Sequence, residues 1–227
     1  MSFDFEKEAL RASGVSGEKQ VAGYKHKLGS LQGDFVRHMK PCLDSLSKAR
    51  ALFDWLWITK PTRYQQGAPF RLNKVIDAQV RKENCVVGNC LGLTLLYNSL
   101  ARRLNLEVAA LYLEHAFGRA PHVLTILEAG DLRFDIEHSL PEGFNYKGHL
   151  DSPVRERWGE RELIADIYHS RANECYETGA YRDALKYYER TIDLNPRYEK
   201  ALLNKAIVWD KIDMEENGSP LTTKTKH

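Results

Sequence analysis

Several features that mark other classes of protein are missing from this sequence of 227 residues. No hydrophobic run approaches the ~18 residues that would suggest a membrane span, and the first residues lack the pattern of a signal peptide. The four cysteines, Cys42, Cys85, Cys90 and Cys175, are too few and too scattered for a disulfide framework. We therefore expect a cytoplasmic protein with reduced thiols.

The sequence also lacks an excess of charge of either sign. Lys and Arg number 33 against 31 Asp and Glu, which gives a net charge of +2 at pH 7. This balance argues against a nucleic acid or a membrane surface as the main partner. Hydrophobic content of 43% and charged content of 28% are typical of a globular chain. The length allows one sizeable core and a smaller appendage.

The residue that most directly indicates chemistry is Cys90. The two residues before it predict a turn, and residues 91–104 predict a strongly apolar helix that starts at this thiol. The partial positive charge of a helix N-terminus favours thiolate over thiol. Further along the chain, His122 can accept the thiol proton, and Asp135 can orient the ring and stabilise imidazolium. This order of residues predicts a cysteine acyl-transfer site.

The histidine and the acid fall on a predicted β-hairpin. Segments 122–128 and 131–137 flank a two-residue turn, Ala129-Gly130, which pairs Glu128 with Asp131. Side chains alternate between the two faces along each strand. The polar side chains that share one face are then His122, Asp135 and Glu137. In this register the carboxylate of Asp135 lies diagonally from His122 and within reach of it.

Other assignments of these roles stay open. Cys85 is an alternative nucleophile, His115 an alternative base and Glu137 an alternative orienting acid. Cys90 can also be a buried helix thiol, because free cysteine is among the most buried residue types. The two cysteines with His115 and His122 form only a weak zinc-binding pattern. We therefore expect neither a metal nor a cofactor.

Hydrophobic periodicity predicts most of the remaining elements. The segments with helical spacing are 5–12, 44–59 and 72–80, and 107–113 reads as a strand. Residues 139–160 contain several prolines and glycines and are predicted to form a long loop that covers the site.

The last third of the chain resembles a tetratricopeptide repeat. Residues 165–196 fit one unit of about 34 residues, with aromatic, small and turn residues at the expected positions: Tyr168, Gly179, Tyr181, Ala184, Tyr188 and Pro196. Residues 199–211 resemble the first helix of a second unit. Since about three repeats are normally needed for independent stability, we expect this segment to lean on the preceding domain.

The central segment, from about residue 47 to residue 139, resembles the transglutaminase-like superfamily of papain-like thiol enzymes. The matching motifs are Lys48-Ala-Arg-Ala-Leu-Phe-Asp-Trp-Leu, Gly88-Asn-Cys-Leu-Gly-Leu-Thr-Leu-Leu-Tyr, Pro121-His-Val-Leu-Thr-Ile-Leu-Glu and Leu132-Arg-Phe-Asp. The resemblance implies that Cys90 is the nucleophile, His122 the base and Asp135 the orienting acid. Some bacterial relatives join such a domain to tetratricopeptide helices.

These observations predict an α+β fold in which the cysteine-bearing helix packs on a small antiparallel sheet. The expected segments are an N-terminal helical or irregular part (1–40), a transglutaminase-like catalytic domain (41–160), a tetratricopeptide-like segment (161–213) and a disordered tail (214–227). The resemblance implies hydrolysis of an amide, peptide or isopeptide bond in a peptide or protein substrate. The alternative is an inactive scaffold that binds a partner protein through its tetratricopeptide-like helices.

Overall fold

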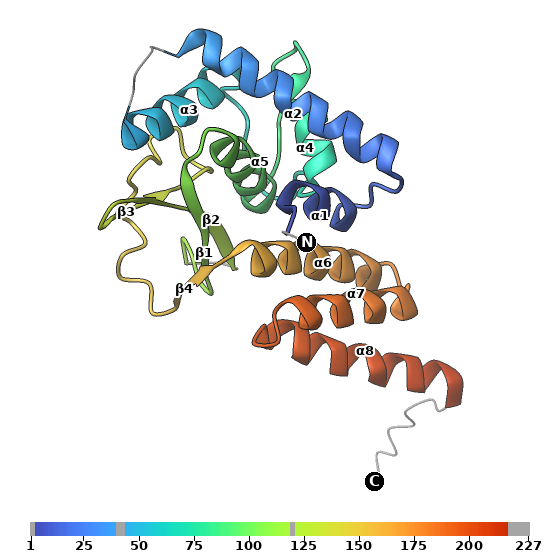
Figure 1. Ribbon diagram of the computed structural model, residues 1–227. Helices are drawn as coiled ribbons and strands as arrows, with labels where there is room; N and C mark the ends of the chain where they lie inside the picture. Colours follow the sequence, from blue (N-terminus) through green and yellow to red (C-terminus); the bar gives the residue numbers. More distant parts are fainter. Residues whose placement is uncertain (1–2, 40–43, 119–120, 218–227) are drawn as a thin grey trace. The chain divides into compact units, whose positions relative to one another are not determined.

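The computed structural model describes residues 3–39, 44–118 and 121–217. Within them it has an α+β fold of eight helices and a four-stranded antiparallel sheet (Figure 1). The chain divides into two compact units, of which the first ends at Leu163 and the second begins at Ile164. Residues 3–39 belong to the same unit as the segment that carries Cys90.

The first unit contains five complete helices and the whole sheet. The helices are α1 (Phe5–Ala12), α2 (Glu18–His38), α3 (Ser45–Thr59), α4 (Leu72–Val80) and α5 (Cys90–Arg103). The strands are β1 (Glu107–Leu113), β2 (His122–Ala129), β3 (Leu132–Ile136) and β4 (Arg155–Trp158). Cys90 is thus the first residue of the helix that precedes the sheet, as the sequence predicts.

Polar residues fix the starts of three of these helices. The carboxylates of Asp4 and Asp44 accept hydrogen bonds from the backbone N–H of the third residue after each. Asn89 does the same for α5, because its side-chain oxygen accepts from the N–H of Gly92 at 3.0 Å. Such caps satisfy N–H groups that have no partner inside the helix. The start of α5 is therefore specified by the residue next to Cys90.

The sheet has the strand order β3-β2-β1-β4, and its hairpin differs from the predicted one. Ala129 pairs with Leu132, so the turn is Gly130-Asp131, and Glu128 pairs with Arg133 rather than with Asp131. The predicted register is wrong because Gly130, with φ of 60°, takes the first central position of the turn, as glycine does in a type II′ turn. The shift is by two residues, so each side chain keeps its predicted face.

Helix α5 forms the centre of the first unit. It contacts β1 and β2, and α1, α2, α3 and α4 all contact it (Figure 1). Its middle is buried on every side, including the polar residues Thr94, Asn98 and Ser99. Each has a hydrogen bond; Asn98, for example, donates to the carbonyl of Ala109 in β1. The bonds of Thr94 and Asn98 join the helix to the sheet, whereas Ser99 bonds within the helix to the carbonyl of Leu95. A buried polar group costs little once it is paired.

The second unit consists of most of α6 (Glu160–Glu177) with α7 (Tyr181–Leu194) and α8 (Glu199–Asn217). Gly179, with φ of 75°, lies in the turn between α6 and α7. Of the residues that the repeat pattern singles out, Ala184 and Tyr188 are buried. The predicted tail after residue 213 is helical as far as Asn217, and the rest of it lies outside the described residues.

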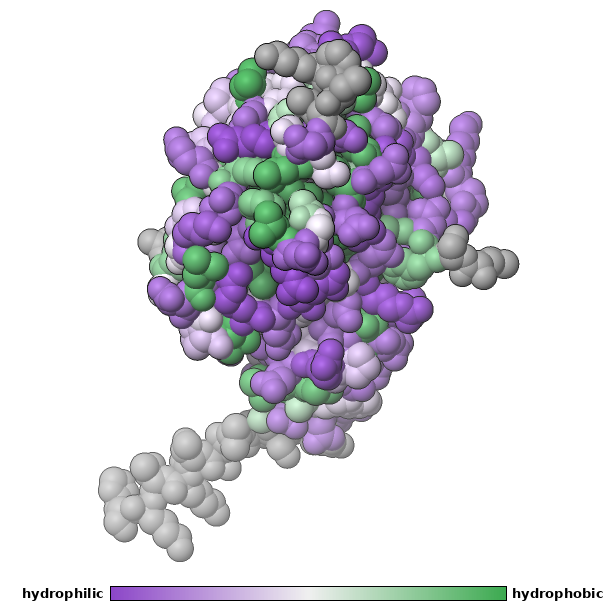
Figure 2. Space-filling model, turned by 60° about the vertical axis from the view of Figure 1, so that its left-hand side comes forward, coloured by the Kyte–Doolittle hydropathy of each residue, from purple (hydrophilic) through white to green (hydrophobic). Residues whose placement is uncertain are grey.

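Two elements were not predicted. Helix α2 is continuous, although Gly23, Gly29 and Gly33 interrupt its sequence pattern, and β4 lies within the predicted loop 139–160. In the described part of the chain, no helix is long and apolar enough to cross a membrane. On the face shown in Figure 2 most of the surface is hydrophilic, and hydrophobic side chains gather in a smaller area.

Candidate functional site

An isolated parallel β-bridge between Tyr64 and Gly88 fixes the backbone that leads to Cys90. The N–H groups of Val87 and Gly88 both donate to the carbonyl of Arg63, at 2.8 and 3.1 Å, and Asn89 donates to the carbonyl of Pro69. Gly92 allows this close approach, because a Cβ on it would lie 2.7 Å from the Pro69 oxygen. The first turn of α5 is therefore anchored to the segment 63–69, and Cys90 has a fixed position.

His122 is the first residue of β2 and lies between the other two members of the candidate site. Its Nε2 lies 2.7 Å from Oε2 of Glu137, and its side chain lines the same cavity as Cys90. The thiol of Cys90 also acts on the pKa of the ring. The imidazole therefore stands between a thiol on α5 and a carboxylate that follows β3.

Two opposing influences act on the pKa of His122. Burial lowers it, but hydrogen bonds with Cys90 and Glu137, together with their negative charges, outweigh burial and raise the pKa to about 10. The ring is then an imidazolium at neutral pH. For Glu137, burial raises the pKa, but hydrogen bonds from His122 and His149 and the charge of His122 hold it well below its usual range. The pair is thus a buried imidazolium and carboxylate.

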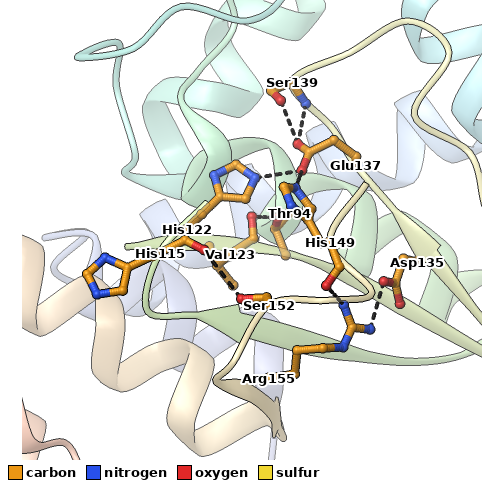
Figure 3. Close-up of polar contacts among 10 residues, drawn as sticks. All are labelled: Thr94, His115, His122, Val123, Asp135, Glu137, Ser139, His149, Ser152 and Arg155. Carbon is orange, nitrogen blue, oxygen red and sulfur yellow. Dashed lines mark hydrogen bonds and ion pairs between the residues drawn. The ribbon is translucent and has the colours of Figure 1, made fainter. Parts of the chain in front are cut away.

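Glu137 is completely buried, and both oxygens of its carboxylate accept hydrogen bonds (Figure 3). Besides His122, Oε2 accepts from Nε2 of His149 at 3.0 Å. Oε1 accepts from both the backbone N–H and the hydroxyl of Ser139, at 2.9 and 2.6 Å. Four donors converge on one carboxylate, which fixes its orientation and compensates for the loss of water.

The predicted contact between Asp135 and His122 is wrong. Asp135 pairs with Ile126, further along β2 than the register had placed it, and Oδ2 accepts from Nη2 of Arg155 at 2.8 Å. The same guanidinium donates through Nη1 to the carbonyl of His149 at 2.6 Å. Asp135 therefore helps to hold the loop that carries His149, and Glu137, the alternative acid, binds His122.

A cavity of about 410 Å³ opens beside the thiol and the imidazole. Its lining includes Cys90 and His122 together with Tyr64, Gln66, Phe117 and Ser139. Phe117 also packs edge-on against the His122 ring, with the ring centroids 5.7 Å apart. Cys90 and His122 therefore lie at the wall of one cavity.

The other candidates from the sequence lie elsewhere. The sulfur of Cys85 is 3.5 Å from the carbonyl of Ala78, and His115 is exposed, with its ring turned away from Glu137 in Figure 3. Within the described residues, the group that could hold a metal is therefore not the cysteine-rich set of the sequence pattern. It consists of His122, Glu137 and His149.

His149 is the site residue that sequence reasoning missed. It lies in the segment between β3 and β4, where no periodicity places a side chain, and the neighbouring Pro and Gly residues predicted only a loop. The one available signal was its type, since histidine is a common acid–base group and metal ligand.

Comparisons with protein-family models, with curated proteins and with solved structures found no match for this chain. A thiol at a helix N-terminus, beside an imidazole that a buried carboxylate holds, is an arrangement that can exchange a proton with a bound group.

Proposed function

We propose that this chain is a cysteine-dependent acyl-transfer enzyme that hydrolyses an amide bond, peptide or isopeptide, in a peptide or protein substrate. Cys90 is the nucleophile, His122 the general base and acid, and Glu137 the orienting carboxylate. The observation that carries the proposal is that Cys90 and His122 line one cavity, while Glu137 holds the ring of His122 at 2.7 Å.

Each step of the reaction has a group to perform it. The thiolate of Cys90 attacks the carbonyl carbon, and the negative charge moves to the carbonyl oxygen, where the backbone N–H of Cys90 can stabilise it. His122 then gives its proton to the leaving amine as the C–N bond breaks. Water, deprotonated by His122, attacks the thioester and releases the acid and the thiol. Glu137 keeps the ring in place and stabilises its charged form.

The fold proposed for this chemistry is the transglutaminase-like one, with a tetratricopeptide-like segment following it. Support comes from the order of the elements, in which a helix that begins at the cysteine precedes an antiparallel sheet that carries the histidine. A reducing compartment such as the cytoplasm suits the proposal, because Cys90 must remain a free thiol.

Selective alkylation tests the proposal without a known substrate. At about pH 6 an ordinary thiol of pKa ~8.5 is barely ionised, so iodoacetamide should label Cys90 much faster than Cys85 or Cys175. Substitution of His122 by Gln should remove this difference. Cys90→Ser should abolish the labelling and any hydrolysis but keep a cooperative melt, because serine is a good residue at a helix start.

A second candidate is a scaffold that binds a partner protein through its C-terminal helices. It is favoured by the apolar residues that α8 exposes, namely Leu202, Leu203, Ile207, Trp209 and Met214. Slow and equal labelling of Cys85, Cys90 and Cys175 at about pH 6 would support this candidate and count against the enzyme.

A further inference from the structure

Two histidines from distant parts of the chain, His122 and His149, each direct their Nε2 atom at one carboxylate oxygen of Glu137. Nε2 of His122 in β2 and Nε2 of His149 in the loop before β4 lie 2.7 and 3.0 Å from Oε2 of Glu137 (Figure 3). All three side chains are buried, and their three ligand atoms lie within 4.8 Å of one another. The proposed chemistry uses His122 and Glu137, but it gives His149 no part in the reaction.

We propose that His122, Glu137 and His149 form a binding site for a divalent transition-metal ion, with Zn²⁺ the best fit. Two imidazoles and one carboxylate are a set that zinc accepts, with a water in the fourth position. Imidazole is a poor ligand for Mg²⁺ and Ca²⁺, which prefer oxygen. The sequence did not predict this site, because its weak zinc pattern used two cysteines and omitted His149.

The three ligand atoms are near enough for one ion to draw them together. Zinc binds imidazole nitrogen at about 2.0–2.1 Å and carboxylate oxygen at about 2.0–2.2 Å, so a nitrogen and an oxygen on one ion are at most about 4.3 Å apart. The two nitrogen–oxygen distances, 2.7 and 3.0 Å, are within that limit, and the three atoms lie within 4.8 Å of one another, so the two rings need to shift toward the ion. An ion takes the place of the protons that the two Nε2 atoms donate to Glu137. The proton displaced from His122 goes to solvent, because Nδ1 of an imidazolium already carries one, and the proton displaced from His149 goes to Nδ1 of its ring or to solvent.

The surroundings of the three ligands are already ordered for metal binding. Ser139 holds the second oxygen of Glu137 with two hydrogen bonds. Arg155 holds the backbone of His149 through its carbonyl, and Asp135 in turn holds Arg155. Groups that orient the ligands in this way typically change metal affinity by about 10–100-fold. The site is therefore held by its neighbours rather than formed by the ion alone.

Occupation of this site also regulates the chemistry at Cys90, a consequence that rests on the proposed function. An ion on Nε2 of His122 takes the place of the hydrogen bond that joins this ring to Glu137 at 2.7 Å. Nε2 is then occupied by the ion, so the ring is no longer held by Glu137 alone beside Cys90 and no longer serves as the base and acid of the proposed reaction. Zinc should therefore act as a reversible inhibitor that does not need Cys90 as a ligand.

Zinc affinity of the full chain tests the site directly. Zn²⁺ is titrated into the protein in competition with a chromophoric chelator, and His149→Gln is compared with the matched control His115→Gln, whose histidine is exposed. We expect one ion per chain for the wild type and for His115→Gln, and at least a ~10-fold weaker affinity for His149→Gln. Equal affinities for the wild type and His149→Gln would overturn the proposal.

A second measurement on the wild type does not depend on any variant folding. Co²⁺ bound by two imidazoles and a carboxylate gives no thiolate-to-cobalt charge-transfer band, whereas a cobalt–Cys90 bond gives one. Absence of the band at one bound ion per chain supports the proposed ligands. A strong band that disappears in Cys90→Ser would show that the ion binds the thiol and that the three-residue site is wrong.

Alkylation of Cys90 separates the regulatory claim from the proposed function. With Zn²⁺ present, labelling of the wild type should slow at least ~10-fold, and labelling of His149→Gln should slow far less. Equal slowing in both would overturn the regulation by this site. If Cys90 is unreactive even without zinc, the proposed function fails, whereas the affinity measurement still decides whether the metal site exists.

Discussion

Glu137 is a charged side chain without access to water, which is costly for a protein unless every lone pair is used. Its two oxygens accept from two imidazoles, one hydroxyl and one backbone N–H. Removal of one partner from such a buried pair is usually far more damaging than removal of an exposed one. The residue should therefore be sensitive to loss of charge, both for the fold and for the state of His122.

The first prediction compares three carboxylates. Glu137→Gln should slow Cys90 alkylation, or turnover once a substrate is known, by orders of magnitude; the comparable change in a serine protease costs ~10⁴-fold. Asp135→Asn should have a smaller effect, because Asp135 acts on the site only through Arg155 and His149. Glu142→Gln, at an exposed position of the same loop, is the control and should match the wild type. A larger loss for Asp135→Asn than for Glu137→Gln would contradict the assignment.

The second prediction concerns pH and stability. The pKa of His122 is about 10 in the folded chain against ~6.5 when unfolded, so protonation of this ring favours the folded state. Its contribution is fully present below about pH 6.5 and is lost as the pH rises through about 10. The difference in melting temperature between wild type and His122→Gln should therefore shrink across this range. A difference that grows with pH would mean that the ring is neutral in the fold.

Among the single residues of the candidate site, the sequence singled out Cys90 and His122 but preferred Asp135 to Glu137 as the acid. Cys90 and His122 stand where helix starts and strand alternation can be recognised. The choice between Asp135 and Glu137 depended on the turn. A change of two residues in register placed Asp135 opposite Ile126, further from His122, without changing the face of the sheet on which it lies. His149 has no periodic neighbours, so only tertiary structure could bring it to Glu137.

Among the elements, the segment between β3 and β4 packs its backbone closely against that of Glu137. The N–H of Glu137 donates to the carbonyl of Gly143 at 2.9 Å, and a Cβ on Gly143 would lie 1.9 Å from the carbonyl oxygen of Glu137. No side chain can be accommodated there without movement of the backbone of one of them.

The third prediction follows from this contact. Gly143→Ala should lower the free energy of unfolding by about 1–3 kcal/mol or more and should also reduce the selective reactivity of Cys90, because Glu137 is displaced. Gly23→Ala, in the exposed part of α2 with nothing near its Cβ, is the matched control and should stabilise by about 0.5–1 kcal/mol. Urea unfolding and alkylation at about pH 6 measure both effects. A neutral Gly143→Ala would mean that the loop adapts freely.

The same contrast explains which elements the sequence could predict. Helices α3, α4 and α5 and strand β1 have regular apolar spacing and lie close to their predicted bounds. Helix α2 was missed because glycine lowers helix propensity, while Val21, Leu28, Leu31 and Phe35 are buried and compensate by packing. Strand β4 was missed because three of its four residues are charged, so only its pairing with β1 makes it a strand.

For the whole molecule, the continuity of α6 links its two units. This helix begins at Glu160 within the first unit and continues to Glu177 in the second, without a break at the boundary after Leu163. A cut at that boundary leaves less than two turns of helix in the first unit, and Leu163, which is 1% exposed, lies at the new end.

The fourth prediction is that a chain ending at residue 163 melts at a lower temperature than the full chain. Short helices are marginal without packing, and three helices are fewer than a repeat array normally needs to be stable by itself. Thermal unfolding of the two chains at equal concentration measures the effect. If the shorter chain keeps its melting temperature, the second unit is an independent module and the helix across the boundary is only a linker.

The strand order β3-β2-β1-β4 leaves two edges, and each is protected against aggregation. Beside the end of β3, the loop that follows it bonds to the backbone. The N–H of Glu137 donates to the carbonyl of Gly143, and the N–H of Tyr146 donates to the carbonyl of Asp135. Strand β4 is only four residues long and carries Arg155, Glu156 and Arg157. Short, charged edges disfavour the addition of a strand from a neighbouring molecule. Within the described residues, another copy of the chain therefore meets edges that are short, charged or partly covered, which disfavours fibres that grow through this sheet.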